Sequence, residues 1–113
     1  MIEKGLVCII KSNCLGSGND EIGTLLMQKF FAMTAEQKTL PEVFAFVNTG
    51  VKLLEDEDVL ARMKELQAQG CKFIFCGTCI NFFKLQDKVN AGIIGNMAQI
   101  QELLFTAKRT VCV

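Results

Sequence analysis

Short apolar runs recur along the chain, and each has the length of a β-strand. Residues 6–10 and 43–47 are uninterrupted apolar stretches, a pattern typical of strands that are covered on both faces. Residues 73–75 are also apolar, within a strand predicted over residues 71–75, and shorter candidates lie at residues 91–94 and 110–113. The pattern therefore predicts a sheet of about five strands.

The segments between these runs have helical periodicity. Asn19 or Asp20 can cap a helix whose apolar positions share one face: Ile22, Leu25, Leu26, Phe30 and Met33. The acids at residues 55–58 suit the first turn of a second helix, where they complement the helix dipole. A short helix follows residue 79, and Asn96 can cap the last one. Because strands and helices alternate, we expect a three-layer α/β/α domain with a mainly parallel five-stranded sheet.

Length and charge narrow the class of protein. The 113 residues form one domain, residues 1–113, with twelve basic and twelve acidic side chains and a formal net charge of zero. No basic patch or run is present, so we expect neither nucleic acid nor an anionic membrane surface as a partner. No apolar segment approaches the roughly twenty residues that a membrane span needs.

The chain contains six cysteines and no histidine. Without histidine, Cys-His catalysis of the protease kind is excluded. The chain starts without a recognisable export signal and has enough apolar residues for a core without disulfides, which favours reduced thiols and a cytoplasmic location. Cys8 and Cys112 lie within strand runs and are interpreted as small buried hydrophobes.

Two cysteines form a Cys-x-x-Cys turn directly after the third apolar run. The turn is Cys76-Gly77-Thr78-Cys79, between the carboxyl end of a strand and the start of a helix. A helix start can lower the pKa of a thiol, and this spacing lets the two sulfur atoms approach each other. The alternatives are a pair of structural thiols or half of a zinc site, which would have to recruit Cys14 or carboxylates. We expect functional thiol chemistry with no metal and no cofactor.

Other residues are candidates for lining this site. Cys14 follows the first strand on the same carboxyl edge, and its loop approaches Cys76 if the first and third strands are neighbours; a cysteine without a role is an equally good interpretation. Lys52 lies on that edge and could attract an anionic sulfur species, although a solvated lysine is the default. One of Phe82 and Phe83 should face away from the core, toward an apolar pocket or a subunit interface. Gly77, Thr78 and Asn81 complete the candidate lining.

Glycines at positions 16 and 18 after the first strand suggest a nucleotide site. The dinucleotide fingerprint would require a third glycine at position 21, where Glu21 stands. Acidic side chains at this helix start would also repel a pyrophosphate. A turn into the helix is therefore the favoured interpretation.

Several stretches resemble one protein family. Residues 76–83, Cys-Gly-Thr-Cys-Ile-Asn-Phe-Phe, resemble the signature of the YedF branch of the DsrE/DsrF/TusD-like sulfur-relay superfamily, and residues 16–23, 48–53 and 96–97 are similar to the same branch. The resemblance implies a DsrE-like fold of flavodoxin-like appearance, assembly into homo-oligomers, and a role in cytoplasmic sulfur or selenium metabolism. In the relay proteins the sulfur-carrying cysteine follows the third strand. Cys76 matches that position, and Cys79 is the neighbour specific to the branch.

One feature of the branch is not matched. YedF-type proteins often carry an amino-terminal TusA-like domain with a Cys-Pro-x-Pro motif, whereas the single proline here, Pro41, follows Leu40. We therefore expect a stand-alone form or a donor domain on a separate protein.

Three functions compete at this point. The leading hypothesis is a sulfurtransferase-like carrier of sulfur or selenium, in which Cys76 holds a persulfide and exchanges it with a TusA-like protein or a cysteine desulfurase. The second is a dithiol-disulfide oxidoreductase, for which Pro41 is badly placed because such enzymes need a proline opposite the thiols. The third is a non-catalytic oligomeric binding module.

Overall fold

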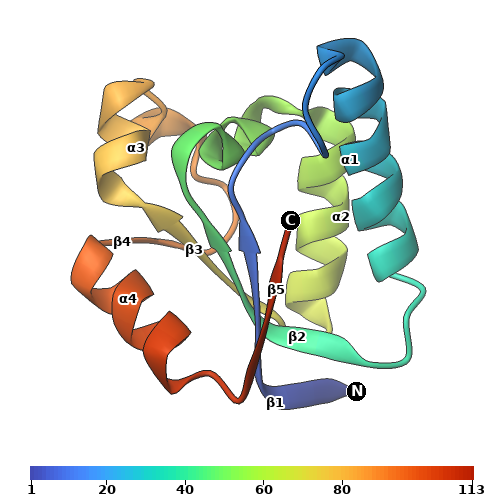
Figure 1. Cartoon of the computed structure of the whole chain (residues 1–113), viewed down its shortest axis with the longest axis vertical. Helices are drawn as coiled ribbons and strands as arrows, with labels where there is room; N and C mark the ends of the chain where they lie inside the picture. The colour runs from blue at the N-terminus through green and yellow to red at the C-terminus, as the bar shows by residue number, and fades with distance from the viewer.

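The computed structural model describes all 113 residues and contains one parallel β-sheet (Figure 1). Its five strands are β1 (Ile2–Ile10), β2 (Leu40–Phe46), β3 (Lys72–Cys76), β4 (Ile93–Gly95) and β5 (Arg109–Cys112). They lie in the order β4-β3-β2-β1-β5, and every neighbouring pair is parallel. The predicted α/β fold is confirmed, with a sheet that is entirely parallel.

Helices cover both faces of this sheet. α1 (Asp20–Thr34) and α2 (Glu57–Ala68) lie on one side, and α3 (Gly77–Phe82) and α4 (Met97–Thr106) lie on the other (Figure 1). Two 3₁₀ segments, η1 (Asn48–Glu55) and η2 (Gln86–Lys88), were not anticipated by the sequence pattern. None of the helices combines the length and the apolar character needed to cross a membrane.

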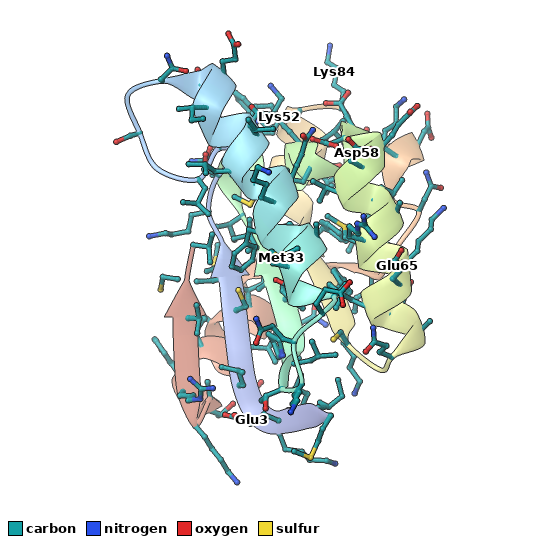
Figure 2. All side chains as sticks on the ribbon, turned by 90° about the vertical axis from the view of Figure 1, so that its right-hand side faces the viewer. Glu3, Met33, Lys52, Asp58, Glu65 and Lys84 are labelled. Carbon is teal, nitrogen blue, oxygen red and sulfur yellow. The ribbon has the colours of Figure 1, made fainter.

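Side chains at the predicted positions cap the longer helices. The Asn19 side chain accepts a hydrogen bond from the backbone N–H of Ile22 at the start of α1. Asp56 caps α2, while Asn96 and Gln99 form a capping box at α4. The acids that follow Asp56 lie on the outside of the first turn of α2, as Figure 2 shows for Asp58. Each cap satisfies backbone donors that would otherwise lack a partner.

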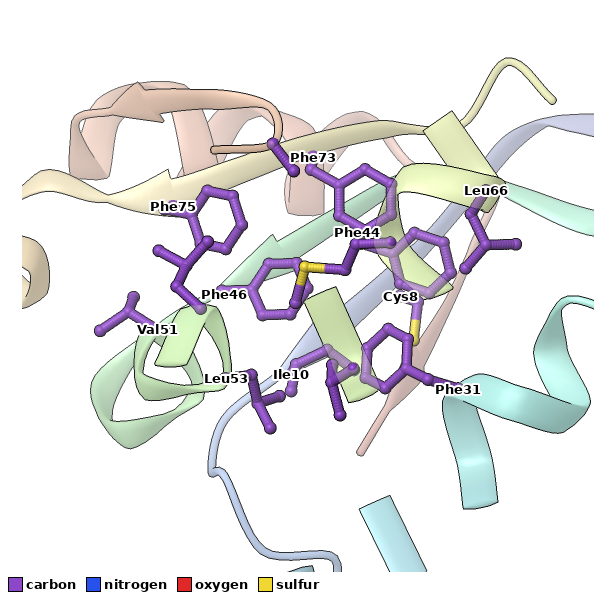
Figure 3. Close-up of a cluster of buried hydrophobic side chains, with 14 of the residues drawn as sticks. Cys8, Ile10, Phe31, Phe44, Phe46, Val51, Leu53, Leu66, Phe73 and Phe75 are labelled. Carbon is purple, nitrogen blue, oxygen red and sulfur yellow. The ribbon is translucent and has the colours of Figure 1, made fainter. Parts of the chain in front are cut away.

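Stacked phenylalanines form the main core, between the sheet and α1 and α2 (Figure 3). Phe46 stacks on Phe75 with ring centroids 4.6 Å apart, and Phe44 stacks on Phe73 at 5.0 Å. Phe31 reaches this stack from α1, 6.2 Å from the ring of Phe46. Burying each such ring contributes on the order of 1.5–3 kcal/mol. The stack therefore joins α1, β2 and β3 into one rigid unit.

A smaller core lies on the opposite face, beneath α4. It consists of alternate strand residues and one helical residue: Ile9, Val43, Ala45, Ile74, Cys76 and Ile100. Successive strand residues point to opposite faces, so the two cores together explain why residues 6–10, 43–46 and 73–76 of the central strands are apolar at every position.

The edge strand β5 departs from the sequence interpretation. Its four residues are all exposed, including Cys112, which was expected to be buried. β5 pairs only with β1 and has solvent along its other side, so its side chains lack the cover that the central strands have.

Candidate functional site

Cys76 is the last residue of β3 and is nearly inaccessible. It continues the strand alternation from Ile74, so its side chain enters the smaller core and only 1% of the residue is exposed. It pairs with Gly95 of β4, and the adjacent Gly77 lies close to Ile94 of the same strand. Neighbouring backbone and side chains therefore enclose the first thiol of the turn.

Cys79 lies one helical turn later, in α3, at the junction of the two cores. It is partly buried and packs against both apolar clusters. Its sulfur accepts a hydrogen bond from the backbone N–H of Asn48, with an N–Sγ distance of 3.1 Å. The Cys76 and Cys79 thiols are close enough to interact, and both are free. The fold therefore brings together the two cysteines that the spacing predicted to approach.

The Asn48 amide is held in place by the turn that follows β2. Asn48 has φ of 53°, a left-handed conformation that asparagine tolerates better than most residues, and its side-chain oxygen accepts a hydrogen bond from Thr49 N–H at 2.8 Å. Val47 N–H donates to the carbonyl of Ile10 at 3.0 Å. A side chain at Gly50 would collide with that same carbonyl. The end of β1 therefore fixes the amide that faces Cys79.

Burial raises the pKa of the Cys79 thiol, and the neighbouring Cys76 adds to the rise. The Asn48 amide acts in the opposite direction, because a donor aimed at sulfur favours the thiolate. The lower thiol pKa expected from a helix start is therefore not found at Cys79, because the partial burial of the sulfur outweighs the effect of the amide on the pKa. The buried strand thiol of Cys8 is more strongly affected: burial raises its pKa to about 12, which makes it unreactive near neutral pH.

The aromatic residues after Cys79 divide as expected. Phe82 is 77% exposed, whereas Phe83 packs on the larger core. Lys52, in η1, places its ammonium 5.2 Å from the centre of the Phe83 ring, within the range of a cation–π contact. Its positive charge lies beside α3, at the edge of the sheet where the thiols are.

The polar candidates in α3 have different surroundings. Thr78 is exposed, and the Asn81 side-chain oxygen accepts a hydrogen bond from Gln86 at 2.9 Å. Asn81 therefore links α3 to η2, while Thr78 has its hydroxyl at the surface of the turn.

Cys14 lies on the same edge of the sheet, but β2 separates its strand from β3. An approach of Cys14 to Cys76 required the first and third strands to be neighbours, and they are not. The Cys14 sulfur instead lies 3.6 Å from the Asp20 carbonyl and 3.7 Å from the Thr24 hydroxyl, both in α1. Its loop touches the turn after β2 through Asn13 N–H, which donates to the Thr49 hydroxyl at 3.4 Å.

The sequence interpretation used residues 48–53 only for the family resemblance and missed the contribution of Asn48. An asparagine directly after a buried strand and before Thr-Gly suggests a left-handed turn, but its amide acquires a partner only through the fold. No group of three or more Cys, Asp or Glu side chains is gathered as a metal site.

The largest cavity, about 710 Å³, lies away from the thiols. It opens between α4 and β3 toward the amino end of that strand, near Lys72 and Glu102, whereas the Cys-x-x-Cys turn follows the carboxyl end. This cavity is therefore separate from the candidate site, because neither Cys76 nor Cys79 lines it.

Comparisons with known proteins agree with this architecture. A search of curated proteins finds no significant match. Among solved structures, the crystal structure of the YchN protein from E. coli is similar, with a TM-score of 0.69 over 96% of this chain and 97% of that chain. At 13% identity this likeness shows a shared fold. The model of the DsrE/DsrF-like family matches residues 18–113, which include Asn48, Cys76 and Cys79. With most of its length matched, the chain belongs to the DsrE/DsrF-like family.

Proposed function

We propose that the protein is an intracellular sulfur carrier that holds a sulfur atom as a cysteine persulfide in the Cys76–Cys79 turn. Membership in the DsrE/DsrF-like family is consistent with sulfur relay. The observation that carries the proposal is a pair of free, adjacent thiols, one of them partly exposed and hydrogen-bonded by a backbone amide. The YedF branch, and selenium as an alternative cargo, belong to the same proposal.

The chemistry requires only thiol exchange. A cysteine thiolate attacks the terminal sulfur of a donor persulfide, forms a new S–S bond, and releases the donor as its thiolate. Delivery repeats this step with the acceptor thiolate as the nucleophile. No electrons enter or leave the system, so no oxidant is needed. A TusA-like protein or a cysteine desulfurase has the required chemistry for the partner.

Exposed apolar side chains next to the turn support a protein partner or a homo-oligomer. They belong to α3, β4 and the start of α4: Phe82, Ile93, Ile94 and Met97. Exposed apolar groups of this kind commonly mark contact surfaces. We propose that this surface, defined by these four residues, receives the donor, the acceptor or a second copy of the chain.

A dithiol-disulfide oxidoreductase is the second candidate, because the two thiols are adjacent. Pro41 lies near the start of β2, at the amino edge of the sheet, whereas the thiols follow the carboxyl end of β3. The proline that such enzymes place opposite their thiols therefore has no counterpart here. This favours the carrier over the oxidoreductase.

Mass spectrometry tests the carrier function. The full chain is incubated with a cysteine desulfurase and cysteine, and the thiols are then blocked with iodoacetamide. We expect an added mass of one sulfur atom in the wild type and in Cys14→Ser, and its loss when Cys76 and Cys79 are both replaced by alanine. Absence of the adduct from every variant would refute the carrier function, whereas insulin reduction at a thioredoxin-like rate would support the oxidoreductase.

A further inference from the structure

The two thiols of the turn differ in their access to a partner. Transfer of sulfur requires the attacking thiolate to touch the terminal sulfur of the donor in line with the bond that breaks. Cys76 is 1% exposed beneath α4, among Ile74 and Ile100, so a donor cannot reach its sulfur in this conformation. Cys79 is partly exposed on α3. A donor molecule therefore meets Cys79 first.

The thiols also differ in the hydrogen bonds that the backbone provides. The backbone N–H of Asn48 donates a hydrogen bond to Cys79 Sγ at 3.1 Å, whereas no backbone amide donates one to Cys76 Sγ. A donor fixed in this way stabilises negative charge on the sulfur without any reorganisation at the moment of reaction. Negative charge develops on the carrier sulfur twice, when its thiol loses a proton before attack and when it leaves as a thiolate after delivery.

We propose, building on the carrier function above, that Cys79 is the thiol that accepts and releases the sulfur atom, and that the Asn48 amide stabilises its anionic form. This reverses the order that the family resemblance implies, in which Cys76 is the carrier. Cys76 contributes through its contact with Cys79 and not as the first acceptor.

Each step balances without a further reactant. In loading, the Cys79 proton passes to solvent, the Cys79 thiolate bonds to the terminal sulfur of the donor persulfide, and the donor leaves as a thiolate. In delivery, the acceptor thiolate bonds to the sulfur carried on Cys79. The bond between that sulfur and Cys79 Sγ breaks, and its electron pair returns to Cys79, beside the Asn48 N–H.

The persulfide is located with single variants and glutathione persulfide as the probe. Cys76→Ala avoids a buried unpaired hydroxyl, and Cys79→Ala and Cys14→Ala are the matched replacements. After alkylation and proteolysis, we expect the added sulfur on residue 79 in the wild type, Cys76→Ala and Cys14→Ala, with loading reduced at least about tenfold in Cys79→Ala, consistent with the different access of the two thiols.

The possible outcomes separate the two proposals. Loading on Cys76 at the wild-type rate in Cys79→Ala overturns the assignment to Cys79 and leaves the carrier function intact. Absence of loading from every variant refutes the carrier function itself. Circular dichroism checks that each variant has the wild-type fold.

The amide is tested by removing its hydrogen. Replacing Asn48 with its α-hydroxy analogue converts the amide into an ester and deletes the N–H while keeping the side chain. We expect delivery of sulfur from Cys79 to glutathione to slow by about tenfold to a hundredfold, the range for a hydrogen bond to a charged group. Asn48→Gly is the rescue control, because glycine retains the N–H and adopts the left-handed conformation readily.

Two results count against the Asn48 assignment. One is an ester variant that delivers sulfur as fast as the wild type. The other is Asn48→Gly as slow as the ester, which would assign the effect to the side chain. Melting temperatures measured for both variants separate a loss of the donor from a loss of structure.

Discussion

Gly50 links the stability of the fold to the position of the Asn48 amide. It is buried in η1, and a Cβ at this position would collide with the carbonyl of Ile10 at the end of β1. The Ile10 carbonyl already accepts a hydrogen bond from Val47 N–H, so neither strand end can move without weakening that bond. The substitution Gly50→Ala therefore pushes the turn after β2 away from β1.

Overpacking of this kind costs about 1–3 kcal/mol. With an unfolding entropy of about 2.1 cal/mol/K per residue, a chain of 113 residues should melt roughly 4–13 °C lower. Because the Asn48 amide moves with the turn, we also expect the alkylation rate of Cys79 in Cys76→Ala/Gly50→Ala to differ from that in Cys76→Ala.

Gly16→Ala is the matched control for this prediction. Gly16 has φ of +84° and no atom within 4 Å of a built Cβ, so alanine there costs about 1–2 kcal/mol of backbone strain and creates no collision. Thermal unfolding followed by circular dichroism and the iodoacetamide rate at Cys79 are measured for both. If Gly50→Ala melts at the wild-type temperature, or alters Cys79 alkylation no more than Gly16→Ala, the link between the turn and the thiol is wrong.

Three further predictions follow from other parts of the fold. The pKa of the Cys8 thiol is about 12 in the folded chain, against 9.0 for an ordinary thiol, so the unfolded chain loses this proton at a lower pH. The free energy of unfolding should therefore fall as the pH rises from about 9 toward about 12. Urea denaturation measured across this pH range should show a smaller fall in the free energy of unfolding for Cys8→Ala than for the wild type. Phe46→Ala should lower the free energy of unfolding by about 3–5 kcal/mol because Phe46 stacks on three other rings. Phe82 is exposed, so Phe82→Ala should change the free energy of unfolding of the monomer by less than about 0.5 kcal/mol. Equal decreases in the free energy of unfolding for the two variants, measured by urea denaturation, would contradict this. Asp56→Ala should lower the free energy of unfolding by about 1–2 kcal/mol, since Asp56 caps α2 and accepts a hydrogen bond from Gln28. An unchanged midpoint of urea denaturation would show that the cap contributes little to stability.

The strands were predictable because their local pattern matches their final environment. The central runs are apolar at every position, and the structure covers both of their faces. Strand order was not predictable in the same way, because neighbouring strands are chosen by contacts between distant segments. β2 lies between β1 and β3, so the first and third strands are not neighbours, as an approach of Cys14 to Cys76 would have required. Similarly, the apolar pattern at residues 110–113 predicted a strand but did not show that this strand occupies an edge of the sheet.

The turn after β2 shows a different limit of sequence reasoning. Residues 48–55 lack a clear helical period, yet they form η1, whose buried side chains Val51, Leu53 and Leu54 belong to the main core. Tertiary packing thus determines a segment whose intrinsic preference is weak. The functional consequence is the position of Asn48, which lies 31 residues from Cys79 in the chain and is connected to it by one hydrogen bond.

The spacing of the Cys-x-x-Cys turn does not indicate which of its two thiols is accessible, whereas the fold buries Cys76 and leaves Cys79 partly exposed. Strand alternation places Cys76 on the same face as Ile74, so its burial follows once both faces of β3 are known to be covered. Three residues later the chain is helical, the alternation no longer applies, and Cys79 lies where both cores and the turn after β2 meet. A sequence can therefore indicate that Cys76 is buried, but only the arrangement of β2 beside β3 identifies Cys79 as the thiol that has both access and a backbone donor.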